Sequence, residues 1–261
     1  MELDTIRQAD IFDLCDPLAD ASVDMILCDL PYGTTACAWD TIIPFEPLWA
    51  AFKRVIKPGG AIVLTASQPF TSALVMSNPR WFRHEWIWEK NTGTSYLNAN
   101  RGPMKNHESV LVFAEGTTHY YPIKGKGDTY RATRGTVGGF IRDKTVGGYV
   151  TVNNGERFPK SVIKFDSSTG LHPTQKPVAL FEYLIRTYTQ PGELVLDPCV
   201  GSGTTALAAR NTGRHFICGD SSAEYVAIAN ARLAEPYTPP MFASEPAAPD
   251  DEQLSFSESE E

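Results

Sequence analysis

The chain has 261 residues, 42% of them hydrophobic and 21% charged, a composition typical of a globular protein with one large domain or two small ones. The absence of a run of 18 apolar residues argues against a membrane-spanning helix, and the first residues lack the basic and apolar regions of a signal peptide. The five cysteines form no C-x-x-C pair, so we expect no disulfide framework, no metal site and a reducing cytoplasm as the location.

The net charge of −8 is distributed unevenly. Eight acidic residues and no Lys or Arg lie between Glu235 and Glu261. We expect 235–261 to be a disordered acidic tail, because its composition buries too little apolar surface to offset the entropy of ordering. Between Arg80 and Lys164, 14 basic residues outnumber 7 acidic ones. This is the pattern of a polyanion-binding surface, although an unevenly charged solvated face is the alternative.

Apolar runs and helical periodicity alternate along most of the chain. The predicted strands cover 22–29, 61–66, 86–89, 109–113, 193–197 and 215–220, and the predicted helices cover 44–56, 68–76, 178–188, 204–211 and 224–233. The stretch from Gly116 to Gly155 holds nine glycines and no long apolar run, which favours a loop-rich insertion with a short hairpin. Alternating strands and helices predict an α/β fold with a mostly parallel sheet covered on both faces.

A glycine loop follows the predicted strand that ends at Asp197. Gly201 and Gly203 let the backbone approach a ligand closely at the start of the next helix. Asp220 ends the following strand, where a carboxylate can accept hydrogen bonds from a ribose. The spacing also fits the G-x-G-x-x-A fingerprint of nicotinamide-dependent oxidoreductases. Asp197, however, would repel a pyrophosphate and suits a cofactor with an ammonium group, which points to S-adenosylmethionine.

A second candidate site follows the strand over 22–29, with the sequence Asp29-Leu30-Pro31-Tyr32-Gly33. A carboxylate oxygen of Asp29 and the Leu30 carbonyl can accept both hydrogens of an exocyclic amino group, while Tyr32 offers a ring for stacking. Such acceptors can hold the amino group as its nitrogen becomes nucleophilic. The alternative is a turn in which Asp29 caps a helix and Tyr32 lies in the core.

Three segments resemble motifs of amino-group DNA methyltransferases. Asp29-Leu30-Pro31-Tyr32 resembles their (Asp/Asn/Ser)-Pro-Pro-Tyr motif, and 195–205 resembles their cofactor loop. His172-Pro173-Thr174-Gln175-Lys176-Pro177 resembles the segment that precedes this loop in the β-class. The order of the motifs also fits the β-class, and the resemblance covers about residues 6–234. It implies a Rossmann-like methyltransferase domain formed by 1–115 and 165–234, with a target-recognition insertion at 116–164.

The resemblance also implies roles for individual residues. The catalytic residues would be Asp29, Leu30 through its carbonyl, Pro31 and Tyr32; Leu30 departs from the usual Pro, which puts the rigidity of the loop in doubt. Thr174 and Lys176 would lie near the methionine carboxylate of the cofactor, and Asp10 near its adenine ring. The complete set of cofactor-binding residues would be Asp10, Thr174, Lys176, Asp197, Gly201, Ser202, Gly203, Thr204 and Asp220. A solvated lysine is the alternative for Lys176.

The sequence therefore predicts direct methyl transfer from S-adenosylmethionine to N6 of an adenine flipped out of double-stranded DNA, as in restriction-modification or phage enzymes. The expected DNA contacts are Lys124, Lys126, Arg131, Arg134, Arg142 and Lys144. A homodimer remains open. The alternatives are N4-cytosine methylation, whose enzymes more often carry Ser in place of Asp29, an RNA substrate, a nicotinamide-dependent oxidoreductase, and a non-enzymatic DNA-binding protein with the same fold.

Overall fold

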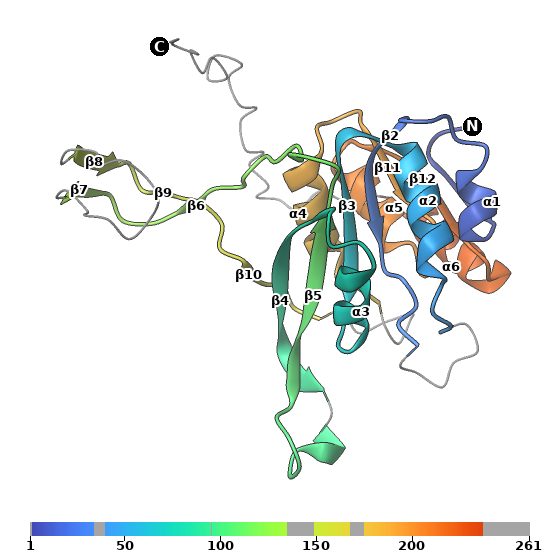
Figure 1. Cartoon of the computed structure of the whole chain (residues 1–261), viewed down its shortest axis with the longest axis horizontal. Helices are drawn as coiled ribbons and strands as arrows, with labels where there is room; N and C mark the ends of the chain where they lie inside the picture. The colour runs from blue at the N-terminus through green and yellow to red at the C-terminus, as the bar shows by residue number, and fades with distance from the viewer. Residues whose placement is uncertain (1, 34–39, 95, 135–148, 168–174, 237–261) are drawn as a thin grey trace.

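The computed structural model describes residues 2–33, 40–94, 96–134, 149–167 and 175–236 (Figure 1). Its centre is an eight-stranded sheet with the strand order β1-β12-β11-β2-β3-β5-β4-β10. In that order the strands are Thr5–Gln8, His215–Asp220, Leu194–Asp197, Val23–Cys28, Ile56–Ala66, Lys105–Phe113, Phe82–Thr94 and Val162–Lys164. The predicted tail from 237 onward lies outside the described residues.

The sheet is mostly parallel, as predicted. Strands β1, β12, β11, β2 and β3 run parallel to one another. Only β5 runs against its neighbours β3 and β4 within the described sheet, and β10 pairs in parallel with β4. The carboxyl ends of β2, β11 and β12 therefore meet along one edge, where sheets of this kind place their ligands.

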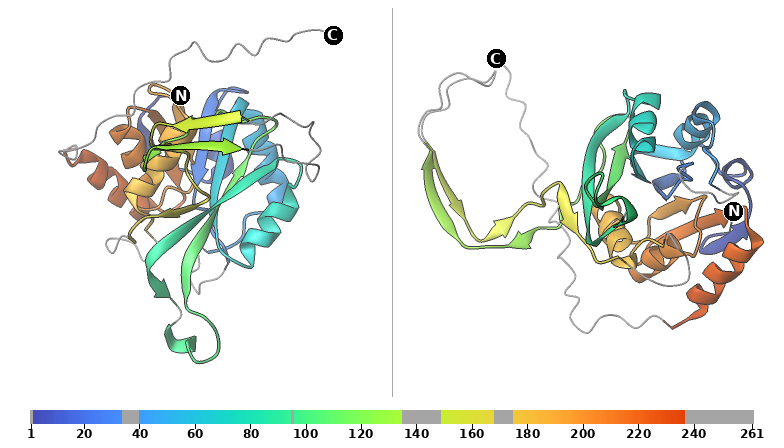
Figure 2. Two further views of the ribbon diagram at one scale, coloured as in Figure 1. Left: turned by 90° about the vertical axis from the view of Figure 1, so that its left-hand side faces the viewer. Right: turned by 90° about the horizontal axis from the view of Figure 1, so that it is seen from below.

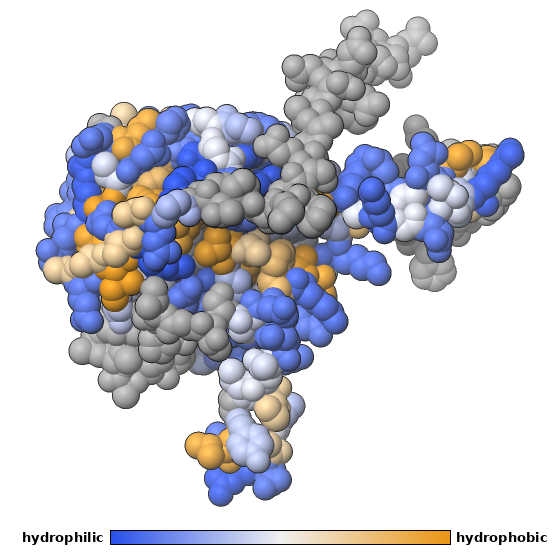
Figure 3. Space-filling model, turned by 180° about the vertical axis from the view of Figure 1, so that it is seen from behind, coloured by the Kyte–Doolittle hydropathy of each residue, from blue (hydrophilic) through white to orange (hydrophobic). Residues whose placement is uncertain are grey.

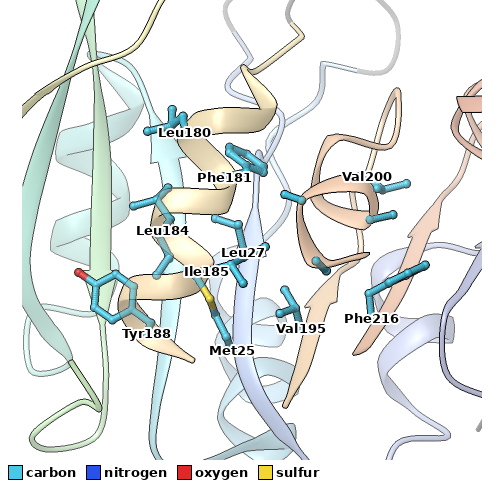
Figure 4. Close-up of a cluster of buried hydrophobic side chains, with 14 of the residues drawn as sticks. Met25, Leu27, Leu180, Phe181, Leu184, Ile185, Tyr188, Val195, Val200 and Phe216 are labelled. Carbon is cyan, nitrogen blue, oxygen red and sulfur yellow. The ribbon is translucent and has the colours of Figure 1, made fainter. Parts of the chain in front are cut away.

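Helices cover both faces of the sheet and enclose two apolar cores. In chain order the helices are α1 (Ile11–Cys15), α2 (Phe45–Val55), α3 (Phe70–Ser77), α4 (Val178–Tyr188), α5 (Thr204–Asn211) and α6 (Ala223–Ala234). Helices α4, α5 and α6 share one core, in which Phe181 and Leu184 of α4 pack on the side of β2 that carries Leu27 (Figure 4). Helices α1, α2 and α3 cover the other face. Within the described ranges, no helix is both long and apolar enough to cross a membrane.

The structure contains elements that the sequence pattern did not predict. Strand β1 and helix α1 have only 4 and 5 residues, too few to establish a periodicity. Strand β3 begins at Ile56, so the Lys-Pro-Gly-Gly segment expected to separate helix from strand is part of the strand itself. Pro58 and the two glycines lie before the residues that pair with β5, where a ladder hydrogen bond is not required.

Strands β4 and β5 are longer than predicted and form an arm with the short 3-10 helix Tyr96–Asn98 at its tip. Ser109 pairs with Ala66, the last residue of β3, so the part of β5 before Ser109 extends beyond the carboxyl edge of the sheet. Tyr96 and Leu97 at the tip are 78% and 96% exposed. The arm therefore projects from the edge that carries the candidate site (Figure 1).

The basic insertion forms two small antiparallel ladders. Strand β6 (Gly125–Lys126) pairs with β9 (Glu156–Arg157), and β7 (Tyr130–Arg134) pairs with β8 (Tyr149–Asn153). These ladders stand away from the main body (Figure 2), and their surface is largely hydrophilic (Figure 3). The last residues of the predicted insertion return as β10 and pair with β4 of the main sheet.

Gly203, at the start of α5, has a left-handed backbone conformation and packs closely against α6. Its φ is +88°, and a Cβ there would lie 2.9 Å from the Cβ of Ala229 in α6. Gly213 is the matched control, because its φ is +71° but a Cβ there would meet nothing within 4 Å. We expect both Gly→Ala variants to lose about 1–2 kcal/mol to left-handed strain. Gly203→Ala should lose at least about 1 kcal/mol more of its free energy of unfolding, because the added methyl group overlaps Ala229 and pushes α5 away from α6. Urea unfolding measures both losses, and equal losses would contradict this packing.

Candidate active site

Three carboxylates predicted from distant parts of the chain lie along the carboxyl edge of the sheet. Asp29 directly follows β2, Asp197 ends β11 and Asp220 ends β12. Strand β11 pairs with both β2 and β12, so the three strand ends are neighbours. The two candidate sites of the sequence, the Asp29 turn and the glycine loop, therefore belong to one region.

The carboxylate of Asp29 is held by three side chains. Its Oδ1 accepts hydrogen bonds from the hydroxyls of Tyr32, at 2.5 Å, and Thr65. Its Oδ2 accepts from the ammonium group of Lys176 at 2.6 Å. Thr65 lies near the end of β3, two residues after Val63, which pairs with Leu27. Because side chains alternate along a strand, Thr65 and Asp29 project from the same face of the sheet.

Tyr32 lies partly buried beside this carboxylate. Its ring stacks on Phe70 at a centroid distance of 5.3 Å, and the Lys176 ammonium nitrogen is 5.5 Å from the Tyr32 centroid. Burial, reinforced by the charges of Asp29 and Glu108, raises the pKa of the Tyr32 phenol well above its ordinary value. The hydroxyl therefore keeps its proton and donates a hydrogen bond to Asp29, and the ring supplies an aromatic face at the strand end.

Lys176 connects the two candidate sites. Its side chain is only 6% exposed, and its ammonium group lies 2.6 Å from Asp29 Oδ2 and 3.4 Å from Glu108 Oε2. Its backbone carbonyl accepts a hydrogen bond from the Thr204 hydroxyl at the start of α5, at 3.3 Å. Burial lowers the pKa of the ammonium, but the two carboxylates outweigh burial and raise the pKa above its ordinary value.

The structure places the ammonium group of Lys176 against a carboxylate of the protein, whereas its place near the methionine carboxylate of a cofactor stays a prediction. We expected its ammonium group near the methionine carboxylate of a cofactor, and we considered a solvated lysine as the alternative. Lys176 is buried, and its ammonium group lies on the carboxylate of the Asp29 turn. Thr174, predicted to act beside it, lies outside the described residues.

The glycine loop is tied to the next strand through Asp220. The Gly201 amide donates to Asp220 Oδ2 at 3.0 Å, and the Ser222 amide donates to Asp220 Oδ1 at 2.9 Å. A Cβ on Gly201 would meet nothing within 4 Å. Ser202 is fixed by Arg232, which donates to its hydroxyl at 3.0 Å and to its carbonyl. The loop is held in place while the space beside Gly201 stays open.

Asp197 is almost completely buried, at 2% exposure. One of its oxygens accepts from the Cys199 amide at 3.0 Å and the other accepts from the Thr205 hydroxyl. Burial raises the pKa of this carboxyl group from 3.8 to about 7, although both hydrogen bonds oppose the rise. The group consequently changes its charge near neutral pH.

Asp10 has a clear structural role. It is the N-cap of α1, and its Oδ1 accepts from the amides of Phe12 at 2.8 Å and Asp13 at 2.9 Å. The neighbouring Ala9 amide donates to the Asp220 carbonyl at 3.1 Å, which brings Asp10 to the end of β12. Asp10 therefore lies at the edge that is predicted to bind the cofactor. Its role as the N-cap of α1 alone, however, explains why an aspartate stands at this position.

The predicted DNA-binding residues lie in the insertion. Lys124, Lys126 and Arg131 are exposed, and Lys124 forms an ion pair with Glu156 at 2.8 Å. Arg134 ends β7, and its side chain is not described. Arg142 and Lys144 lie outside the described residues.

Sequence reasoning missed two groups at this site. Thr65 is the one hydroxyl in the apolar run of the second predicted strand, a signal that could have identified it. Glu108 lies within β5 at the base of the arm, directly before the predicted strand over 109–113; this place suggested proximity to the active edge but gave the residue no role, which only its contact with Lys176 indicates.

Comparison with known proteins identifies the class. Residues 23–231 match the DNA methylase family, so the chain belongs to this family, whose members methylate N6 or N4 amino groups. The type II methyltransferase M1.MboII of Moraxella bovis is 29% identical over 88% of this chain and 96% of its own length. Family membership confirms the predicted DNA methyltransferase and its methyl donor, S-adenosylmethionine, and it leaves the choice between adenine and cytosine open.

Solved structures agree with the fold. The M1.HpyAVI–SAM complex has a TM-score of 0.60 and 26% identity, and the match covers 88% of this chain and 99% of that one. The PvuII DNA methyltransferase, which is cytosine-N4-specific, has a TM-score of 0.64 and 16% identity over 88% and 86% of the two chains. The Rossmann-like methyltransferase fold predicted from the sequence is confirmed.

The raised pKa of Asp197 predicts how stability depends on pH. The folded state holds the proton up to about pH 7, whereas the unfolded carboxyl group releases it near its ordinary pKa of 3.8. This contribution is therefore complete below about pH 4 and is lost as the pH rises from there to about 7, with an upper limit of about 4 kcal/mol. Asp197→Asn, which mimics the neutral acid, should flatten this part of the profile. Urea unfolding between pH 4 and 8 measures it, and parallel wild-type and variant profiles would contradict the assignment.

Proposed function

We propose that the chain methylates N6 of adenine at specific sites in double-stranded DNA, with Asp29, Leu30, Pro31 and Tyr32 as the catalytic turn. One observation carries this proposal: the Asp29 turn and the glycine loop share one edge and are joined through Lys176. A nucleobase at the turn and a cofactor at the loop would therefore be neighbours. Holding two reactants in this way supplies much of the rate enhancement of a transfer reaction.

The residues at the glycine loop fit S-adenosylmethionine. The open side of Gly201 leaves room for a ligand close to the backbone. Asp220 lies where a carboxylate can accept hydrogen bonds from ribose hydroxyls, and ionised Asp197 attracts an ammonium group. Ser202, Gly203 and Thr204 complete the loop. The bound cofactor supplies a methyl group that its positive sulfonium already activates.

The protein then needs no nucleophile of its own. Cys28 is fully buried, and burial raises the pKa of its thiol well above the ordinary value. A hydrogen bond with Cys28 lowers the thiol pKa of Cys199, also near the site, but burial together with the nearby carboxylate charges outweighs this bond and raises the pKa above its ordinary value. Neutral thiols of this kind are packing residues rather than attacking groups.

The work of the catalytic turn is to bind and orient an amino group. Asp29 and the Leu30 carbonyl accept its two hydrogens, which favours a pyramidal nitrogen whose lone pair can attack. Tyr32 stacks on the base, and Pro31 fixes the direction of the turn. Extruding the base costs a few kcal/mol, which stacking and phosphate contacts offset.

The insertion supplies the contacts to DNA in this proposal. Lys126 and Arg131 are exposed on ladders that stand away from the body, among glycines and hydroxyl side chains suited to phosphates and base edges (Figure 2). Lys124 directly precedes β6 and Arg134 ends β7, while Arg142 and Lys144 belong to the segment between β7 and β8. In this proposal the enzyme acts as a soluble protein in the cytoplasm, and the proposal is compatible with a homodimer.

N4 of cytosine is the alternative target. Its amino group is conjugated to the ring in the same way, and two acceptors with a stacking residue would serve it equally. The cytosine-specific PvuII enzyme shares the fold of this chain. Asp29 favours adenine only through the motif resemblance, because enzymes for cytosine more often carry Ser at this position.

Nucleoside mass spectrometry tests target and catalyst together. DNA incubated with wild-type protein and S-adenosylmethionine should contain N6-methyladenine. Asp29→Ala should produce none within detection, at least about a hundredfold less, because the amino group loses its principal acceptor.

Calorimetric binding of S-adenosylmethionine is the control for this variant. The cofactor should still bind to Asp29→Ala with an affinity within about threefold of wild type, since Asp29 lies on the base side of the site. Methylated cytosine as the product would select the alternative target, and full activity of Asp29→Ala would reject the catalytic turn.

The role of the insertion predicts a salt effect. Lys126→Ala/Arg131→Ala should weaken DNA binding regardless of sequence and reduce the slope of log K against log salt by about 0.9 for each phosphate contact removed. Lys53→Ala, on α2 over the Trp81 ring, removes a charge from the main body and is the control. Fluorescence anisotropy at several salt concentrations measures the slopes. Equal slopes for the double variant and wild type would show that these two residues do not contact DNA phosphates.

A further inference from the structure

The carboxylate of Glu108 has one oxygen without a hydrogen bond. Oε2 is buried and accepts no hydrogen bond among the described residues, although it faces the Lys176 ammonium nitrogen at 3.4 Å. A buried acceptor without a hydrogen bond is unfavourable even when a charge lies nearby. Such a cost at an active-site edge suggests that the oxygen gains its partner in another state of the site.

The rest of Glu108 is rigidly held. Its Oε1 binds the ammonium group of Lys90, which also lies 4.7 Å from the centroid of the Trp88 ring. Trp88 is the residue opposite Glu108 in the β4–β5 ladder, so all three side chains share one face of the sheet. The pairing of β4 with β5 therefore fixes the direction of Glu108 Oε2, and Lys90 balances the charge of the carboxylate.

Asp29, by contrast, already has donors on both oxygens. Two hydroxyls fill Oδ1, and Lys176 takes one of the two acceptor positions of Oδ2. An incoming amino group would have to share Oδ2 with the charged ammonium group of Lys176, which is the stronger donor. Among the three donors, Lys176 has a second carboxylate within reach, and a shift of its ammonium group from Asp29 to Glu108 would keep the charge paired in a buried environment, where an unpaired charge is most costly.

We propose that Glu108 is a positioning residue that receives the Lys176 ammonium group from Asp29 when the target base enters, and so frees Asp29 Oδ2 for the amino group of the base. The proposal rests on the proposed function, in which Asp29 binds that amino group. No proton changes hands, because Lys176 remains an ammonium ion in both positions. Its backbone carbonyl stays bonded to Thr204, so the side chain moves while the segment stays in place.

The first test uses the protein without cofactor or DNA. The pKa of the Lys176 ammonium is followed by NMR on protein labelled with ¹⁵N-lysine, with Lys176→Arg for the assignment. In Asp29→Asn, Glu108 should take over the ammonium and keep its pKa at or above the ordinary 10.5. In Asp29→Asn/Glu108→Gln, unopposed burial should bring the pKa below this value. An equal decrease in the single and double variants would overturn the proposal.

The second test measures the reaction. Glu108→Gln should slow single-turnover methylation by at least about tenfold while the affinity for S-adenosylmethionine stays within about twofold of wild type. Glu89→Gln, on the adjacent strand, breaks an ion pair with Lys164 at 3.2 Å and should leave the rate unchanged. An unchanged rate in Glu108→Gln would overturn the proposal, and so would a loss explained by weaker cofactor binding.

The two tests separate this inference from the proposed function. No DNA methylation by the wild-type protein would contradict the proposed function itself. The NMR comparison does not require methylation, and it decides whether Glu108 takes over the ammonium group even in that case. If Glu108→Gln and the double variant fail to fold, the single variant Asp29→Asn, which leaves Glu108 intact, still decides the matter: a Lys176 pKa at or above 10.5 supports the transfer to Glu108, and a pKa below 10.5 overturns it.

Discussion

The architecture of the site depends on Lys176, which forms hydrogen bonds both through its backbone carbonyl and through its ammonium group. The Lys176 carbonyl is bonded to the start of α5, next to the glycine loop, and its ammonium group is bonded to the carboxylate that follows β2. These two regions are separated by about two-thirds of the chain, and the sheet order brings them within the reach of one side chain. The same lysine thereby sets the charge and the orientation of Asp29.

Charged side chains at this edge of the sheet are buried together and balance one another. Two carboxylates, Asp29 and Glu108, and two ammonium groups, Lys176 and Lys90, form an alternating row of balanced charge. In a buried setting the loss of any member leaves an uncompensated charge, which is more costly than the pair itself is worth. Hydroxyl donors from Tyr32 and Thr65 complete the acceptors of Asp29. A site of this kind holds its carboxylate oriented before a substrate arrives.

The sequence was sufficient to predict the elements and motifs with strong local signals. Long apolar strands, the amphipathic helices and the two strand-end motifs all lie where the pattern placed them, because burial in a parallel sheet leaves a continuous apolar run in the sequence. Strand β1 and helix α1 were missed because they are too short for a period. The arm was missed because its outer part is polar, and only pairing between β4 and β5 keeps it extended.

The partner of Lys176 could not be predicted for a different reason. The resemblance placed this residue near the methionine carboxylate of the cofactor. Which carboxylate an ammonium group reaches depends on the direction of the side chain across the sheet edge, and no sequence spacing encodes that direction. Glu108 was left without a role for the same reason, since its contact with Lys176 depends on strands that meet only in three dimensions.

The central claim is that the Asp29 turn and the glycine loop form a single site for methyl transfer. A crystal structure of the protein soaked with S-adenosylhomocysteine tests it most directly. The account predicts this reaction product beside Gly201, with its ribose at Asp220 and its sulfur directed toward Asp29 across a space that a nucleobase can fill. The product bound on another face of the sheet, or with its sulfur directed away from Asp29, would contradict the account.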